Sequence, residues 1–401
     1  MNSAQKQVLI ACMLVTFAFG SIHAFSVFLP PLEESLVLAR AKLSLIYSFS
    51  LIALTIMVLF GYRIYAVVQP NLMILISAIC AALGLFWSAN ATSWLELVIS
   101  YSVIFGATNG IAYGYSLQLV GRALPRGKKA FGMALVTATY AVGSVVFSFG
   151  LGYLVDNFSA SLALKSLGLS VLMVGIIASV LLKRSQIQYT PISTKSGKTP
   201  VNDSIVSFKV VAMLWCSYCT AVFAGLMAIG HATGVIQSLG GNYNLGVWGA
   251  VFIGIGSSIG GGVISFLLSN KNTNRFLIGL PLVSAVFLCA LVFVDVPLWA
   301  VGLLSFVGLA YGALIAVYPF AIAEYFGETL GPKVYGQVFT AWGFAGLAGP
   351  WLAGKLYDLT GAYQFALATA GGIAIISMVT FYGFLQYKAK YPLHLTRLAK
   401  V

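Results

Sequence analysis

The sequence predicts an all-α membrane protein in which twelve transmembrane helices form two pseudo-symmetric six-helix bundles. Three observations predict this fold class: a very apolar composition, a series of uncharged segments long enough to cross a bilayer, and a repeat of half the chain length. Of the 401 residues, 60% are hydrophobic and 8% are charged, and the mean hydropathy is +0.96. Soluble domains carry about 25% charged residues. Lipid must therefore surround much of this protein.

The charged residues divide the chain into long apolar segments. A helix needs roughly 20 apolar residues to cross the hydrocarbon core of a bilayer. Twelve segments meet this requirement: residues 7–32, 43–62, 70–93, 97–121, 130–155, 166–182, 210–237, 244–270, 276–294, 296–323, 334–354 and 359–387. We predict one transmembrane helix in each of them.

One connection between these segments is long and polar. Residues 183–209 contain five lysines or arginines among serines, threonines and two prolines. This composition is typical of a linker. We therefore predict an N-terminal six-helix bundle at 1–182, a cytoplasmic linker at 183–209, and a C-terminal six-helix bundle with a cytoplasmic tail at 210–401.

The distribution of positive charge predicts how the helices are oriented. Eighteen of the 22 lysines and arginines fall on the side of the termini and the linker, and four fall on the other side: Arg40, Lys42, Lys165 and Lys355. Cytoplasmic loops are enriched in positive charge. We expect a multi-pass protein of the cell inner membrane with both termini in the cytoplasm. Because topology accounts for the net charge of +13, we expect no nucleic-acid partner.

The two halves of the chain share short motifs at a nearly constant offset. Gly106 and Gly110 return as Gly308 and Gly312, the pair at 131–132 returns at 335–336, and Gly152–Asp156 returns as Gly354–Asp358, with offsets of 202 to 204 residues. Each match alone could reflect ordinary helix packing through small residues. Together they indicate an internal repeat, which is typical of transporters that bind their substrate between two related halves.

These features are accompanied by motifs that resemble a known family. The motifs are Gly225–His231, Tyr318-Pro319, Glu324–Gly327, Tyr335-Gly336, Ala341–Gly343, Gly349-Pro350, Gly354 and Asp358–Tyr363. With the twelve helices and the linker, the chain resembles the major facilitator superfamily and, within it, the oxalate/formate antiporter and monocarboxylate transporter group. The resemblance implies the major facilitator fold and secondary active transport of a small organic anion, a monocarboxylate, by alternating access. It also implies proton coupling or exchange.

The sequence departs from that family at the expected anion contacts. In oxalate and monocarboxylate carriers, an arginine in helix 8 and a lysine in helix 11 meet the substrate carboxylate, and here those positions are Gly262 and Trp342. The loop after helix 2, Gly61–Tyr65, also lacks the acidic residue that is usual in the superfamily. We expect oxalate to be a poor substrate, because a dianion loses its hydration without compensation in a cavity that has no fixed positive charge.

Two histidines lie inside predicted helices. His23 in helix 1 and His231 in helix 7 are near repeat partners, at an offset of 208. The resemblance implies that both helices line the central cavity. Imidazole titrates near pH 6.5, and its cation can pair with a carboxylate. We predict that both histidines face the cavity from opposite halves, bind substrate and couple it to protons. A neutral histidine that bonds a neighbouring helix is the structural alternative.

Aromatic and amide side chains complete the predicted site. Asn109, Tyr113 and Ser116 share one face of helix 4, and Tyr311 and Tyr318 share one face of helix 10. Helix packing is the alternative role for each of them, and for Tyr140 and Trp342. The predicted substrate-binding residues are His23, Asn109, Tyr113, Tyr140, His231, Tyr311, Tyr318 and Trp342.

The sequence offers little for other functions. We find no catalytic residues, metal cluster or nucleotide motif, and Cys216 and Cys219 form an isolated pair inside a helix. We predict a protein that is not an enzyme, needs no cofactor or metal, and works as a monomer in the bilayer on a small molecule and protons. Two alternatives remain open: an exporter of neutral or weakly basic amphipathic compounds, and a non-transporting membrane receptor.

Overall fold

A computed structural model describes residues 1–65, 67–125, 128–187, 206–268 and 272–390, and the regular structure in these ranges is helical throughout. Most of the predicted linker and the last eleven residues of the tail lie outside the described residues. The elements before the linker are α1 (Ser3–Phe19), the 3₁₀ helix η1 (Gly20–Phe28), α2 (Leu29–Leu36), α3 (Arg40–Phe60), α4 (Tyr62–Tyr65), α5 (Pro70–Ser88), α6 (Trp94–Leu97), the π-helix η2 (Val98–Phe105), α7 (Gly106–Ala123), α8 (Lys129–Asn157) and α9 (Ala160–Ser185). We call this part of the chain the N half.

The C half contains five long elements. They are α10 (Phe208–Ser238), α11 (Tyr243–Leu267), α12 (Thr273–Val292), α13 (Pro297–Thr360) and α14 (Gln364–Lys390). In α13 the torsion angles of Gly327, φ 69° and ψ −175°, interrupt the helix, so that residues 328–360 fold back along Pro297–Gly327. A hydrogen bond from Trp342 to Tyr311 joins the two arms. These arms hold the tenth and eleventh predicted helices.

Eleven helices within the described residues are long and apolar enough to cross a membrane, and the second arm of α13 supplies the remaining predicted helix. The predicted fold class is therefore confirmed. Several boundaries were wrong by up to six residues; α5, for example, ends at Ser88 rather than 93. Helix α9 begins at Ala160 rather than 166, because Lys165 lies inside the helix near its end, where a long side chain can reach polar surroundings. The last helix begins at Gln364 rather than 359, after a turn in which Gly361 has φ 72°.

Close glycine contacts repeat in both halves. A Cβ atom on Gly106 or Gly110 of α7 would overlap the backbone of Ser50 and Leu54 in α3. In the C half, a Cβ atom on Gly308 or Gly312 of α13 would overlap the backbone carbonyls of Ile253 and Ser257 in α11. The same pair of helices thus meets through the same glycines in each half, as the sequence repeat predicts. The likeness of the halves extends from sequence to packing.

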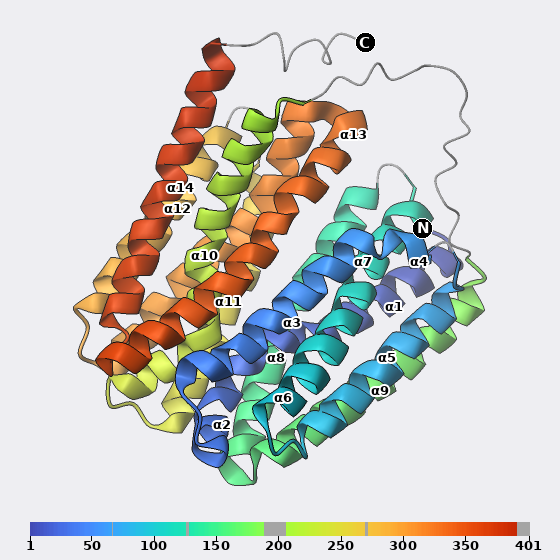
Figure 1. Cartoon of the computed structure of the whole chain (residues 1–401). Helices are drawn as coiled ribbons and strands as arrows, with labels where there is room; N and C mark the ends of the chain where they lie inside the picture. Colours follow the sequence, from blue (N-terminus) through green and yellow to red (C-terminus); the bar gives the residue numbers. More distant parts are fainter. Residues whose placement is uncertain (66, 126–127, 188–205, 269–271, 391–401) are drawn as a thin grey trace.

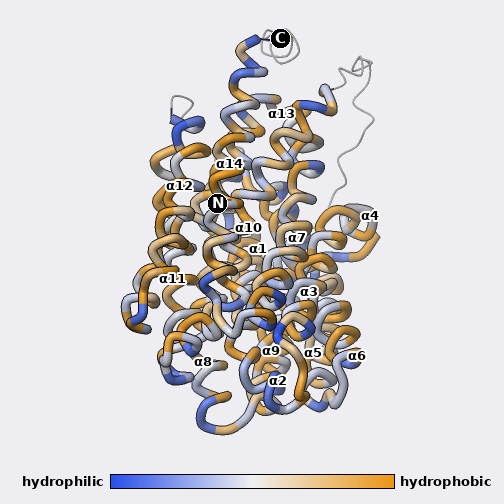
Figure 2. Tube along the Cα trace, turned by 60° about the vertical axis from the view of Figure 1, so that its left-hand side comes forward, coloured by the Kyte–Doolittle hydropathy of each residue, from blue (hydrophilic) through white to orange (hydrophobic). Residues whose placement is uncertain are grey.

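The two halves lie side by side and meet more closely toward one end (Figure 1). We call this end, where α2 and the start of α3 lie, the Arg40 end, and the opposite end, where the chain leaves α9 and enters α10, the linker end. Along α3 and α13, contacts run from Ala41 against Gly354 to Thr55 against Gly343. Beyond this stretch the ribbons of the halves diverge toward the linker end. The tube in Figure 2 is hydrophobic along most of its helices, as a lipid-facing surface requires.

Candidate functional site

His23 lies in an unusual stretch of backbone. The first membrane-spanning segment, Ser3–Leu36, contains nine residues of 3₁₀ helix, Gly20–Phe28, between two α-helices. Runs of 3₁₀ helix this long are uncommon, and inside an α-helix they often mark a functional hinge. His23 is partly exposed, whereas the other residues of this stretch are buried. Within this 3₁₀ helix, His23 is therefore the residue that is not buried.

Aromatic rings from both halves surround the imidazole. Its Nδ1 lies 2.7 Å from the hydroxyl of Tyr47 on α3. Its ring meets those of Tyr140 on α8 and Trp342 on α13 edge to face, with centroids 5.6 and 6.4 Å away. The ring of Tyr113 on α7 is 4.9 Å from that of Tyr140. Together with Tyr311, described below, we call these residues the central aromatic cluster.

Small residues bring α8 against the first helix. A Cβ atom on Gly20 would lie 2.0 Å from the backbone oxygen of Tyr140, and one on Gly143 would lie 1.9 Å from that of Phe17. The two backbones can approach this closely only because both positions are glycine. This contact places the ring of Tyr140 beside His23.

Asn109 supports the cluster from inside the N half. It is fully buried, and its side-chain amide donates to the backbone oxygen of Phe19, at 2.6 Å, where α1 passes into the 3₁₀ stretch. Its side-chain oxygen accepts from the hydroxyl of Tyr140 at 3.0 Å. Asn109 therefore orients Tyr140 and satisfies a carbonyl at the helix transition. In this conformation the Asn109 side chain bonds protein groups.

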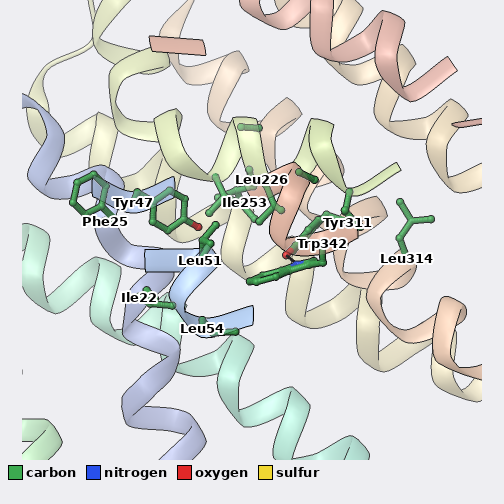
Figure 3. Close-up of a cluster of buried hydrophobic side chains, with 14 of the residues drawn as sticks. Ile22, Phe25, Tyr47, Leu51, Leu54, Leu226, Ile253, Tyr311, Leu314 and Trp342 are labelled. Carbon is green, nitrogen blue, oxygen red and sulfur yellow. Dashed lines mark hydrogen bonds between the residues drawn. The ribbon is translucent and has the colours of Figure 1, made fainter. Parts of the chain in front are cut away.

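The C half contributes a hydrogen-bonded aromatic pair. The indole nitrogen of Trp342 donates to the hydroxyl of Tyr311 at 2.9 Å, and the two side chains are 5% and 6% exposed. Figure 3 draws this pair within a cluster of buried side chains from both halves, including Tyr47 and Leu51 of α3. The ring of Tyr311 packs against Gly225 of α10, where a Cβ atom would lie 2.4 Å from the ring. Gly225 thus makes room for Tyr311.

Protein does not completely cover the central aromatic cluster. His23, Tyr113 and Tyr140 are partly exposed although they lie between the two halves. Within the described residues, the cluster contains hydroxyl, indole and imidazole groups but no carboxylate, ammonium or guanidinium group. Such a surface can stack on an apolar ligand, donate hydrogen bonds, and become positively charged at His23.

Two predicted residues lie outside this cluster. Tyr318 is fully buried inside the C half, where its hydroxyl lies 2.8 Å from the Ser217 side chain and its ring packs on Tyr218. His231 is 1% exposed and is hydrogen-bonded to groups at the Arg40 end. In this conformation, the prediction that the two histidines face each other across a central cavity is wrong. The remaining six predicted residues are brought together.

The Arg40 end contains polar residues that the sequence analysis did not single out. Arg40 is 9% exposed and forms an ion pair with Glu33 of α2. Its guanidinium group donates to the hydroxyl of Tyr363 at 3.2 Å and lies 3.9 Å above the ring of Tyr357. The sequence signal of Arg40 was its place among only four cations on the charge-poor side, close to two glutamates.

The side chain of Asp358 joins the halves at the same end. Its two oxygens accept from the backbone N–H groups of Arg40 and Ala41, at 3.0 and 2.9 Å. A carboxylate is favourable there because the first N–H groups of a helix have no partner within the helix and the helix dipole is positive at that end. Among the described residues, no group of histidines, cysteines and carboxylates could hold a metal ion.

The fold and the cluster between two similar halves define a transport protein of the membrane. The model of the Major Facilitator Superfamily matches residues 9–350, and the chain belongs to this family. The uncharacterized MFS-type transporter YhjX of Escherichia coli K12 is 23% identical over 354 residues, which are 84% of this chain and 85% of that protein.

Solved transporter structures share the fold. A bacterial homolog of the human lysosomal transporter Spinster, inward-facing and unoccupied, has a TM-score of 0.67 at 14% identity and covers 99% of this chain and 98% of its own. A mutant of the nucleoside transporter NupG has a TM-score of 0.72 at 13% identity, with 95% and 99% covered. The chain is therefore a multi-pass membrane transporter that handles a small molecule.

Proposed function

We propose that the protein is a secondary active transporter that moves a small organic anion, a monocarboxylate, with a proton or in exchange, by alternating access between its halves. The observation that carries this proposal is the position of His23. His23 carries the imidazole of the central aromatic cluster, and an imidazole can gain a proton and with it a positive charge. Protonated His23 can pair with one carboxylate, so the proton and the anion bind as a neutral pair and each favours the other.

The cluster supports this substrate class by what surrounds the imidazole. The rings of Tyr140 and Trp342 meet the imidazole of His23 edge to face, and the ring of Tyr113 packs at a tilt against that of Tyr140. Hydroxyl and indole donors can bind carboxylate oxygens, while the rings contact an apolar substituent. Without a fixed cation in the cluster, a dicarboxylate such as oxalate fits poorly. Asn109 and Tyr311 then act by holding Tyr140 and Trp342.

The second candidate is an exporter of neutral or weakly basic amphipathic compounds. The absence of charged side chains from the cluster favours it, because aromatic surfaces bind such compounds without any ion pair. The two candidates differ in their dependence on pH. The first requires a proton on His23, and the second does not.

The orientation of the protein in the membrane and its division into two bundles and a linker are also part of this proposal. With 18 of 22 cations on the side of the termini and the linker, that side is cytoplasmic and the membrane is the inner membrane. The Arg40 end then faces outward, and the closer contacts there make this conformation inward-facing. The predicted N-terminal bundle, 1–182, and C-terminal bundle, 210–401, rock against each other about the cluster, and the linker, 183–209, connects them.

Flux into proteoliposomes tests the proposal. A panel of small monocarboxylates, oxalate and a hydrophobic amine is offered at external pH 7.5 and 5.5. We expect uptake of a monocarboxylate that rises at pH 5.5, and no oxalate binding in the micromolar range. His23→Gln keeps a hydrogen-bonding group and removes titration, so it should flatten this pH profile. Uptake of the amine alone, with an unchanged profile in His23→Gln, would establish the second candidate.

A further inference from the structure

His231 is at the centre of a buried hydrogen-bond network that ties the halves together at the Arg40 end. Its Nδ1 lies 2.7 Å from the Tyr363 hydroxyl, and its Nε2 lies 2.8 Å from the Pro350 backbone oxygen and 3.1 Å from the Ser44 hydroxyl. Ser44 and Arg40 belong to α3 of the N half, and the other partners belong to the C half. The network therefore exists only while this end is closed.

The partners of the imidazole determine where its proton lies. Arg40 has only N–H donors, so the Tyr363 oxygen accepts from Arg40 and can donate its own proton to Nδ1. The carbonyl oxygen of Pro350 can only accept, so Nε2 carries the hydrogen. The Ser44 hydroxyl donates to the Arg40 backbone oxygen at 2.7 Å, which leaves its own oxygen as an acceptor for Nε2. All of these bonds are satisfied by a neutral imidazole.

A proton added to Nδ1 would disrupt this arrangement. The Tyr363 oxygen would then have to accept from two cations, Arg40 and the imidazolium, and its own proton would lose its acceptor. Other charged groups at this end do not relieve the conflict. The carboxylate of Glu33 already pairs with Arg40, and that of Asp358 accepts from the start of α3. Tyr357 presents its ring to Arg40, and the Tyr47 hydroxyl bonds His23.

We propose that His231 is a proton switch for the Arg40 end, which closes only when this imidazole is neutral and opens when it is protonated. The inference rests on the alternating access of the proposed function but not on the substrate. In the open state α3 separates from α13, water reaches His231, and the imidazole can take up a proton. Protonation from the outer side therefore stabilises the outward-open state.

The two histidines then have different tasks, linked through α3. His23 bonds Tyr47, and His231 bonds Ser44 one helical turn earlier. The ring of Tyr47 also packs close to Gly230, the residue before His231. A Cβ atom on Gly230 would lie 3.2 Å from that ring. A movement of α3 that releases His231 must therefore disturb the partner of His23. This contact gives a physical route from the outer proton site to the central cluster.

The distance between spin labels at the Arg40 end tests the switch without substrate. Labels are placed at Ser35→Cys of the N half and Leu359→Cys of the C half, both exposed, with the five native cysteines replaced. If only the open state binds the proton, its ratio to the closed state should rise about tenfold between pH 8 and pH 5.5. The longer distance should therefore gain population at pH 5.5.

Three variants separate His231 from other titrating groups. In His231→Gln, the amide offers one acceptor to Tyr363 and donors to Pro350, so the closed state should persist at both pH values. His23→Gln removes the imidazole of the central aromatic cluster, and a pH response that survives in this variant assigns the response to another group. Tyr363→Phe leaves Nδ1 free, so the open population should rise at pH 8 and the pH response should shrink.

Thermal unfolding identifies variants that do not fold. For the variants that fold, each outcome either supports or overturns the proposed switch. A wild-type distance that does not change with pH, or an equal pH response in His231→Gln, would overturn the switch. A response lost only in His23→Gln would also overturn it. A switch that behaves as expected in a protein that carries no monocarboxylate would leave this inference standing and refute the proposed substrate.

Discussion

The Tyr311 hydroxyl gives a buried indole its acceptor and so fixes the orientation of Trp342 in the cluster. Replacing Tyr311 with Phe leaves a buried N–H group unsatisfied, which costs about 1–3 kcal/mol. We expect Tyr311→Phe to lower thermal stability accordingly and to weaken substrate binding, as measured by unfolding in detergent and by flux. Tyr382→Phe is the matched control, because Tyr382 is 57% exposed. Equal stability of the two variants would contradict this role.

Asp358, at the Arg40 end, gives a second prediction about a single residue. Its carboxylate accepts from the backbone of Arg40 and Ala41 across the two halves. Asp358→Asn removes the charge at the start of α3, where a helix terminus favours an anion by about 0.3–1 kcal/mol, up to about 2 when partly buried. Because Asp358 is exposed, the lower range applies, and we expect the Arg40 end to open about two- to fivefold more often in the spin-label measurement. A closed population equal to wild type would show that the cap is dispensable.

The contrasting surroundings of the two histidines show where sequence reasoning about residues succeeded and failed. Both histidines lie inside membrane-spanning segments, as predicted, and both rings reach α3. The sequence could not show that Tyr363 lies within 2.7 Å of His231, because that contact depends on how the second arm of α13 packs against α3. Arg40 was missed for the same reason, since its partners in the C half, Asp358 and Tyr363, are more than 300 residues away.

At the scale of elements, glycines determine how closely helices pack. A Cβ atom on Gly308 would lie 2.0 Å from the backbone oxygen of Ile253, whereas one on Gly302 of the same helix would meet nothing within 4 Å. We expect Gly308→Ala to destabilise the C half by about 1–3 kcal/mol, as overpacking does, and Gly302→Ala to have little effect. Thermal unfolding of both variants in detergent measures the difference. Similar stabilities would show that α13 and α11 can separate without cost.

Apolar length predicted which segments form helices but not how their backbones are wound. The first segment was predicted as 7–32, and the structure divides Ser3–Leu36 into α-helix, 3₁₀ helix and α-helix. An α-helix and a 3₁₀ helix of the same sequence have the same hydropathy, so hydropathy cannot distinguish them. The 3₁₀ helix is accompanied by tertiary contacts, those of Gly20 with Tyr140 and of Asn109 with the Phe19 oxygen, which hydropathy does not predict. Cutting at charges also misplaced the start of α9, because Lys165 lies within that helix.

At the scale of the whole molecule, the repeat and the apolar segments were sufficient to predict the fold, because lipid requires every spanning segment to satisfy its own backbone. The conformation could not be predicted in this way. Closed and open ends use the same helices, and the difference lies in contacts such as Thr55 with Gly343 and Arg40 with Asp358. These contacts depend on the position of one half relative to the other, which no local pattern encodes.

The orientation of the whole molecule gives a further prediction. Leu359 is 68% exposed at the Arg40 end, and Ser196 belongs to the predicted linker. In a cysteine-free background, a membrane-impermeant thiol reagent should label Leu359→Cys in intact cells, and should label Ser196→Cys only after permeabilisation. The physical reason is the excess of lysine and arginine on the linker side, which is retained in the cytoplasm during insertion.

The reverse labelling pattern would change more than the topology. The closed Arg40 end would then face the cytoplasm, and the conformation described here would be outward-facing. His231 would take its proton from the cytoplasm, so acidification outside the cell could not open that end directly. Labelling of these two positions therefore also decides from which side of the membrane the pH must be changed to operate the proposed switch.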